Sequence, residues 1–220
     1  MKQIGKTSKN FSQIKIKKIF NQKKSYWRKI MNALKNKDFT IISHNCVGGV
    51  IYHDLGLKFN TPTINLFFMA KDFIKFCNNL IHYLNCEMEP FNHEKYDYPI
   101  GQIDDVLLYG LHYNSFEELK EKWDERKKRV NHDNLFIMMS ERDGCTLEDI
   151  ENFDRLPFEN KVIFVHKPMP NIKSAHYIPN TETIENGENC VVPLSEFKEG
   201  ENKRYIDDFD YISFLNKGTI

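Results

Sequence analysis

The chain has 220 residues with no formal net charge, and 40% of its residues are apolar and 13% aromatic. This length suits one domain, or one domain with a small appendage, and the apolar content excludes a globally disordered chain. The neutral total hides an asymmetry. Residues 1–37 carry twelve basic and no acidic residues, whereas the remainder carries nineteen basic and thirty-one acidic residues. The sequence therefore predicts a basic arm, residues 1–37, followed by a single acidic domain, residues 38–220.

The five cysteines are odd in number and widely separated, at positions 46, 77, 86, 145 and 190. This usage indicates reduced thiols in a cytoplasmic protein and not a disulfide framework. No segment approaches the ~20 consecutive apolar residues that a membrane-spanning helix needs. The amino terminus also lacks the apolar core and cleavage site of a signal peptide. We expect a cytoplasmic protein, with peripheral contact at the inner face of the cell membrane as a further option.

That option depends on the basic arm. Trp27, Ile30, Met31 and Leu34 recur at helical spacing among lysines, which predicts a basic amphipathic helix. Such a helix can lie on an anionic membrane surface, and it can equally be a solubilising arm that docks on the domain. Nucleic-acid binding is the least favoured of the three interpretations, because the domain itself is acidic.

Strands and helices alternate along the rest of the chain. Short apolar runs predict buried strands at 39–42, 106–109, 135–139 and 161–165, with an edge strand at 175–178. Helical spacing predicts helices after residue 47, over 73–84, over 116–130, after Thr146 and over 205–215. This alternation favours an α/β domain of three layers, a mostly parallel, Rossmann-like sheet with helices on both faces.

The stretch 39–56 predicts a ligand-binding corner. An apolar strand runs through a polar turn into Gly48 and Gly49 and then into a helix. Two glycines allow the backbone to approach a ligand, and the first N–H groups of a helix attract an anion. The stretch matches neither the dinucleotide fingerprint nor the phosphate loop, so the ligand stays open.

Polar side chains follow four of the predicted strands. In a parallel sheet ligands bind beyond the carboxyl ends of the strands, so these residues are expected to meet at one edge. Loops after strands are polar in most proteins, and each residue has a purely structural interpretation as well. The residues are Ser43, His44, Asn45, His112, Asn114, Ser140, Arg142, Asp143, His166 and Lys167.

Other candidates carry weaker signals. Cys46, beside His44 at a helix start, is either an activated nucleophile or a small buried cysteine. Asp104 and Asp105 suit Mg²⁺ or Mn²⁺, although solvated acids at a turn are favoured because the pair precedes its strand. Arg129 has Asp133 within reach as a partner. The histidines show neither H-E-x-x-H nor tight Cys/His spacing, which predicts no zinc site.

Several motifs together carry a family resemblance. They occupy residues 43–49, 52–56, 61–65, 98–101, 104–106, 112–116 and 123–136. With these motifs the chain resembles the domain found in bacterial capsule and exopolysaccharide biosynthesis proteins, some of which are treated as glycosyltransferases. The resemblance implies a nucleotide-sugar donor and a lipid-linked glycan acceptor. No nucleic-acid partner is expected, because the domain is acidic. It also implies ligand binding by the last motif, through Arg129, Asn131, Asp133 and Asn134.

The leading hypothesis is therefore a glycosyltransferase-like enzyme of capsule or exopolysaccharide assembly. Asn45, Gly48 and Gly49 would hold the donor phosphates, Arg129 or Arg142 would add positive charge, and His44 or Asp143 would deprotonate the acceptor hydroxyl. A bridging Mg²⁺ or Mn²⁺ ion is left open. The alternatives are a glycan-modifying transferase or hydrolase with His44 and Cys46 or Ser43 as a nucleophilic centre, and a non-enzymatic assembly factor docked by its arm.

Overall fold

A computed structural model describes residues 33–182, 185–186, 189–190 and 192–217. The chain divides into two units, residues 1–35 and 36–220, and the second unit holds every strand of the described part. The predicted arm, residues 1–37, lies almost entirely outside the described residues.

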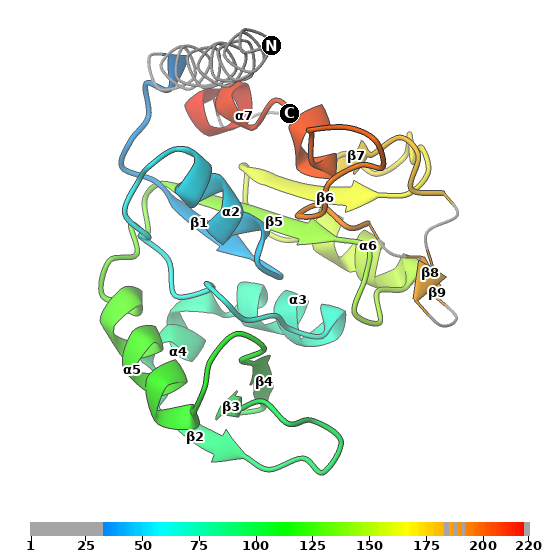
Figure 1. Cartoon of the computed structure of the whole chain (residues 1–220). Helices are drawn as coiled ribbons and strands as arrows, with labels where there is room; N and C mark the ends of the chain where they lie inside the picture. Colours follow the sequence, from blue (N-terminus) through cyan, green and yellow to red (C-terminus); the bar gives the residue numbers. More distant parts are fainter. Residues whose placement is uncertain (1–32, 183–184, 187–188, 191, 218–220) are drawn as a thin grey trace, which may run out of the picture. The chain divides into compact units, whose positions relative to one another are not determined.

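The central sheet has four parallel strands in the order β1–β5–β6–β7 (Figure 1). Its strands are β1 (Thr40–Ser43), β5 (Leu135–Ser140), β6 (Lys161–Val165) and β7 (Ala175–Tyr177). All four were predicted, including β7 at the edge. Most of β1, β5 and β6 is buried, as expected for strands covered on both faces.

Helices cover both faces of this sheet (Figure 1). On one face, Ile137 and Ile163 join a core with α3 (Ala70–Asn78) and α6 (Leu147–Asp154). On the other, Phe136 packs its ring 5.3 Å from that of Phe214 in α7 (Tyr211–Lys217). The helix α2 (Val47–Asp54) and the 3₁₀ helix η1 (Tyr205–Asp208) lie on that second face. The prediction of an α/β domain with helices on both sides of a parallel sheet is confirmed.

One predicted strand belongs elsewhere. The chain forms a second, antiparallel sheet in the order β2 (Met88–Phe91), β3 (Ile100–Ile103) and β4 (Val106–Tyr109). The strand β4 was expected in the parallel sheet, and that prediction was wrong. Only Asp104 and Asp105 separate β3 from β4, and a two-residue connection joins antiparallel strands, whereas parallel neighbours need a long crossover. A short hairpin, β8 (Glu185–Asn186) and β9 (Asn189–Cys190), completes the strands.

The amphipathic helix predicted over 73–84 is broken in two. Asn79, at φ −135° and ψ 48°, separates α3 from α4 (Leu80–Asn85). Asparagine is a poor helix former, so the break falls where the sequence is weakest. The break also changes which side chains face the core. An unbroken helix over 73–84 predicts that Cys77 and Ile81 share the buried side; Cys77 is buried, but Ile81 is 64% exposed.

Side chains cap the amino ends of two helices. In α6, Thr146 and Asp149 form a complete capping box. In α5 (Phe116–Lys127), the Ser115 side chain accepts from the Glu118 backbone N–H, whereas the Glu118 carboxylate accepts from Asn114 instead of closing the box.

Candidate functional site

The carboxyl ends of β1, β5 and β6 meet at one edge of the parallel sheet. Asn45 Nδ2, after β1, donates to Ser140 Oγ at the end of β5, at 2.8 Å. His166, after β6, lies with Nδ1 2.6 Å from Glu141 Oε2 and donates its backbone N–H to the same oxygen. Side-chain hydrogen bonds therefore connect the three strand ends. Glu141 was missed by the sequence analysis, although it lies within the polar run that follows β5.

His44 is the most unusual residue of this edge. Its side chain is fully buried, and within the described chain neither ring nitrogen has a hydrogen-bond partner. Burial lowers the pKa of His44 to about 4, because the charged imidazolium would lose its hydration. The Asp143 carboxylate opposes this shift, and so do weak contacts with the backbone of Phe68 and Ser140 that fall outside ordinary hydrogen-bond geometry, whereas Arg142 adds to it. The imidazole is therefore neutral at neutral pH.

Unpartnered buried polar atoms are rare in native proteins, and each needs an explanation. Trp123 Nε1 is the other such atom in the described chain, and it lies in the apolar core beside Phe76. His44 differs because a charged pair lies next to it.

That pair is Asp143 and Arg142. Asp143 Oδ2 lies 3.8 Å from His44 Nε2 and accepts from Arg142 Nε at 3.1 Å. Both contacts use the same oxygen, so neither occupies Oδ1. The Asp143 side chain is 18% exposed and that of Arg142 32% exposed, so solutes can reach the pair. Asp143 has φ 54°, a left-handed conformation that costs energy in residues other than glycine.

The glycines do not form the expected open turn. The helix α2 begins at Val47, so Gly48 and Gly49 lie in its first turn. A Cβ on Gly48 would approach Ser43 Oγ to 2.6 Å, and one on Gly49 would lie 3.3 Å from Ile64 Cδ1. The glycines thus allow α2 to pack closely on its neighbours. The turn itself consists of residues 44–46, where Asn45 Oδ1 accepts from the Val47 N–H at 3.1 Å.

The geometry disfavours a thiol or hydroxyl nucleophile. Burial raises the pKa of Cys46, which opposes the activation expected at a helix start. Ser43 is fully buried, and its hydroxyl donates to the Asn45 carbonyl at 2.7 Å.

Two predicted residues lie on a different sheet edge. His112 and Asn114 follow β4, which belongs to the antiparallel sheet. The backbone N–H of His112 donates to the Asn65 carbonyl. The backbone N–H and the side-chain Nδ2 of Asn114 both donate to Glu118 Oε2. They do not join the four-strand convergence that the sequence predicted.

The residues of the last family motif lie at the amino end of β1 and β5. Asn131 and Asn134 donate to the Asp38 carbonyl, and Asp133 donates its backbone N–H to Asn131. Arg129 pairs with Glu125 and donates to the Phe59 carbonyl, so the expected pair with Asp133 was wrong. These residues precede β5, which places them at the sheet edge opposite His44.

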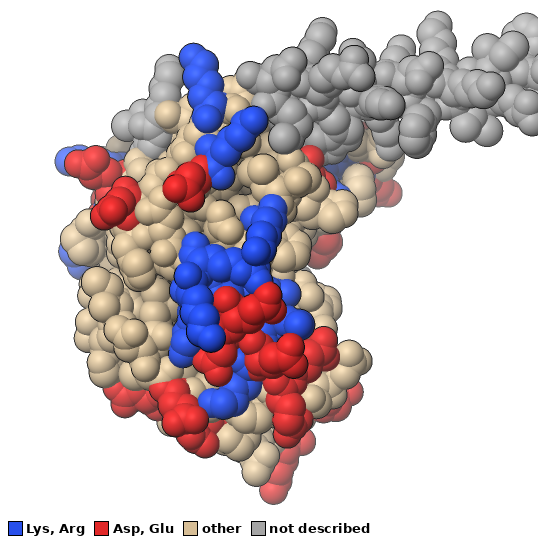
Figure 2. All heavy atoms as spheres, turned by 90° about the vertical axis from the view of Figure 1, so that its left-hand side faces the viewer, with Lys and Arg blue, Asp and Glu red and all other residues tan. Residues whose placement is uncertain are grey.

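Lysine and arginine side chains gather among acidic ones on the face shown in Figure 2. The helix α5 lies on this side of the molecule, and several bases of the helix and the residues just after it pair with its acids. The pairs are Lys122 with Glu125, Lys127 with Asp124, and Arg129 with Glu125. Two residues of the basic run 126–129, Lys127 and Arg129, are therefore compensated by acids of α5, whereas Arg126 donates to the Tyr113 hydroxyl.

An aromatic cavity lies beside the carboxyl edge. It has a volume of about 450 Å³ and is lined by residues of β2, the loop that follows and the start of β3, with Phe91, Tyr96 and Tyr98 among them. Burial raises the pKa of Tyr98 to about 12, with further contributions from Tyr96, Tyr109, Asp97 and Asp143. The cavity adjoins the carboxyl edge through residues 67 and 68: the Tyr98 ring lies 6.4 Å from that of Phe67, and Phe68 donates its backbone N–H to the His44 carbonyl. The spacing of these aromatics is irregular, so the sequence carries no signal that identifies them as a site.

The acidic pair Asp104 and Asp105 forms the turn between β3 and β4. Asp105 pairs with Lys75 at 3.1 Å, and Asp104 Oδ2 lies 2.8 Å from His82 Nε2. His82 and Cys86 stand four residues apart at the end of α4, a spacing that the sequence analysis overlooked.

These features define an α/β protein with a buried histidine and a charged pair at the carboxyl edge of a parallel sheet. The chain belongs to the family described as "Domain of unknown function (DUF1919)", whose model matches residues 15–216. It is 43% identical over 204 residues to a protein of Haemophilus influenzae that is described as an uncharacterized protein. The match covers 92% of this chain and 97% of that relative. None of the helices in the described residues has the length and apolar character that crossing a membrane requires.

Proposed function

We propose that this protein is a glycosyltransferase-like enzyme that acts at the carboxyl edge of its parallel sheet. The observation that carries the proposal is the unpartnered, neutral His44 lying 3.8 Å from Asp143, beside Arg142. An unpartnered buried histidine and a left-handed, partly exposed aspartate each reduce the stability of the fold. Such destabilising features persist in proteins mainly at functional sites.

Asp143 is the proposed general base. Its Oδ2 lies against His44 and Arg142, so Oδ1 is the oxygen that would accept a proton from a sugar hydroxyl. The neutral, fully buried imidazole of His44 lies 3.8 Å from Oδ2, on the interior side of the carboxylate. His44 is thus a positioning residue, since its full burial prevents contact with a substrate.

Arg142 is the proposed anion-binding group. Its contact with Asp143 uses Nε, and the two terminal guanidinium nitrogens are not used in it. These nitrogens suit the diphosphate of a nucleotide sugar, because arginine can bind phosphate oxygens in pairs. Arg129, the other candidate, lies at the opposite edge of the sheet.

The aromatic cavity is the proposed sugar subsite. Sugar rings have apolar C–H faces that pack on aromatic rings, and their hydroxyls bond to groups such as tyrosine O–H. Tyr96 and Tyr98 are half-buried with ring centroids 5.2 Å apart, which leaves aromatic surface open to a ligand. A lipid-linked glycan acceptor, a role in capsule or exopolysaccharide assembly, and membrane contact through residues 1–37 are further parts of the proposal.

Binding of UDP-, GDP-, CMP- and dTDP-sugars, with and without Mn²⁺, tests the proposal by thermal shift and calorimetry. One nucleotide class should raise the midpoint by a few degrees at concentrations well above its dissociation constant. Arg142→Gln should weaken that binding about 10- to 100-fold, the loss expected for a charge-assisted contact. Arg155→Gln is the matched control, because Arg155 is an exposed arginine just after α6 that pairs with Glu151. A folded protein that binds no nucleotide sugar, or equal binding by wild type and Arg142→Gln, would reject the proposal.

A further inference from the structure

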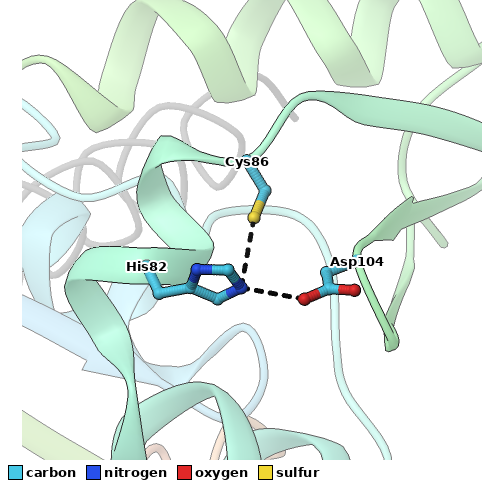
Figure 3. A group of neighbouring side chains, drawn as sticks. All are labelled: His82, Cys86 and Asp104. Atoms are coloured by element: carbon cyan, nitrogen blue, oxygen red, sulfur yellow. Dashed lines mark hydrogen bonds and ion pairs between the residues drawn. The ribbon is translucent and has the colours of Figure 1, made fainter.

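A histidine, a cysteine and an aspartate meet where α4 faces the turn between β3 and β4 (Figure 3). His82 and Cys86 lie four residues apart, so the helical repeat brings them to the same side of α4. Asp104 reaches them from the turn, where its backbone adopts φ 53°. The ligand atoms of the three side chains all lie within 4.8 Å of one another.

The geometry excludes a catalytic triad of these residues. In a triad the histidine uses one nitrogen toward the nucleophile and the other toward the carboxylate. Here Nε2 of His82 faces both partners, with Asp104 Oδ2 at 2.8 Å and Cys86 Sγ at 3.6 Å. A single nitrogen has one lone pair or one hydrogen, so it cannot serve both partners as a proton relay requires.

The same convergence suits a metal ion. Thiolate, imidazole and carboxylate ligands bind Zn²⁺ at about 2.0–2.3 Å, which places tetrahedral ligand atoms roughly 3.3–3.7 Å apart. The 3.6 Å between sulfur and nitrogen already fits this range. The Asp104 oxygen, 2.8 Å from the nitrogen and within 4.8 Å of the sulfur, has to shift away from the nitrogen and take up a position equidistant from both. The mixture of sulfur and nitrogen ligands selects Zn²⁺ over Mg²⁺ or Mn²⁺.

The surroundings permit a cation. Lys75 is paired with Asp105, and Lys127 is paired with Asp124 at 2.8 Å, so the nearest ammonium groups are already balanced. The side chains of His82 and Asp104 are 46% and 53% exposed, which gives an ion direct access from solvent.

We propose that His82, Cys86 and Asp104 form a Zn²⁺ site with three protein ligands and an open fourth position for water. The ion would link the end of α4 to the β3–β4 turn and so brace the antiparallel sheet, whose residue Ile100 lines the aromatic cavity. The site is separate from the proposed transferase centre and does not depend on it.

The test is metal titration of the full chain, stripped of metal by chelation and kept reduced. One equivalent of Co²⁺ should produce the near-ultraviolet charge-transfer band of a cobalt–thiolate bond, and Zn²⁺ should displace it. Zn²⁺ should also raise the thermal midpoint by a few degrees. Cys86→Ser should abolish the band, and His82→Gln and Asp104→Asn should each weaken Zn²⁺ binding at least tenfold.

Two control variants are matched to the ligands. His53→Gln removes an exposed histidine that also lies beside an aspartate, Asp54 at 3.4 Å, but that has no cysteine in its group. Cys46→Ser removes a half-buried thiol from another part of the chain. Both should bind Co²⁺ as the wild type does. Absence of the band in wild type, its persistence in Cys86→Ser, or a stoichiometry of one ion per two chains would overturn the site.

Discussion

The buried histidine makes a prediction about stability and pH. The pKa of His44 is 6.5 in an exposed setting and about 4 in the folded protein. The unfolded chain therefore takes up a proton at His44 as pH falls below 6.5, whereas the folded protein takes it up only near pH 4. By proton linkage, the free energy of unfolding falls over this window and is unaffected by His44 above it.

The size of the effect follows from the shift. One pKa unit corresponds to about 1.4 kcal/mol, so the folded protein should lose about 3 kcal/mol between pH 6.5 and pH 4 because of His44 alone. His44 is fully buried, so solvent does not screen this cost. It is a substantial part of the roughly 5–15 kcal/mol that stabilises a typical domain.

Urea denaturation of wild type and His44→Leu at several pH values measures how much His44 contributes to the pH dependence of the free energy of unfolding. Carboxylates that do not contact His44, and His176, whose pKa is also lowered by burial, titrate in both proteins and cancel in the difference. The two curves should run parallel above pH 6.5, and toward pH 4 the free energy of unfolding of the wild type should fall by about 3 kcal/mol relative to that of His44→Leu. His53→Gln, which removes an exposed histidine of α2, should follow the wild type. Parallel curves for wild type and His44→Leu over the whole range would refute the account.

Two further predictions concern the neighbouring corner. Gly48→Ala should destabilise the fold by about 1–3 kcal/mol, because the new Cβ would clash with Ser43 Oγ. Gly49→Ala should leave stability nearly unchanged, because its Cβ meets only the flexible end of the Ile64 side chain and alanine has the higher helix propensity. Chemical denaturation of both variants measures the difference, and equal stability of the two would contradict the packing role of Gly48. Cys46 should react slowly with iodoacetamide in the native protein, and Cys46→Ser should retain turnover, because burial raises the pKa of this thiol. Rapid inactivation by iodoacetamide that Cys46→Ser prevents would instead restore the nucleophile hypothesis.

The sequence by itself determined the strands of the parallel sheet. The apolar runs in β1, β5 and β6 are continuous, and only a strand buried on both faces needs that pattern. The polar residues after these strands were identified for the same reason, since the carboxyl ends of parallel strands share an edge.

Tertiary structure decided what no local pattern specifies. The strand β4 has the same apolar character as β5, and only the two-residue turn at Asp104 and Asp105 assigns it to an antiparallel partner. Because of the break at Asn79, the side chains of α4 do not continue the helical repeat of α3. Ile81 is therefore exposed, and His82 lies beside Asp104.

The candidate sites divide in the same way. His44 and Asp143 lie 99 positions apart in the sequence, and their 3.8 Å contact exists because β1 and β5 pair in parallel register. Arg129 and its motif were separated from them because they precede β5 instead of following it. Residue types and spacing can indicate which groups have useful chemistry. Which of these groups meet is decided by strand pairing and helix direction, because both bring together segments that are distant in the chain.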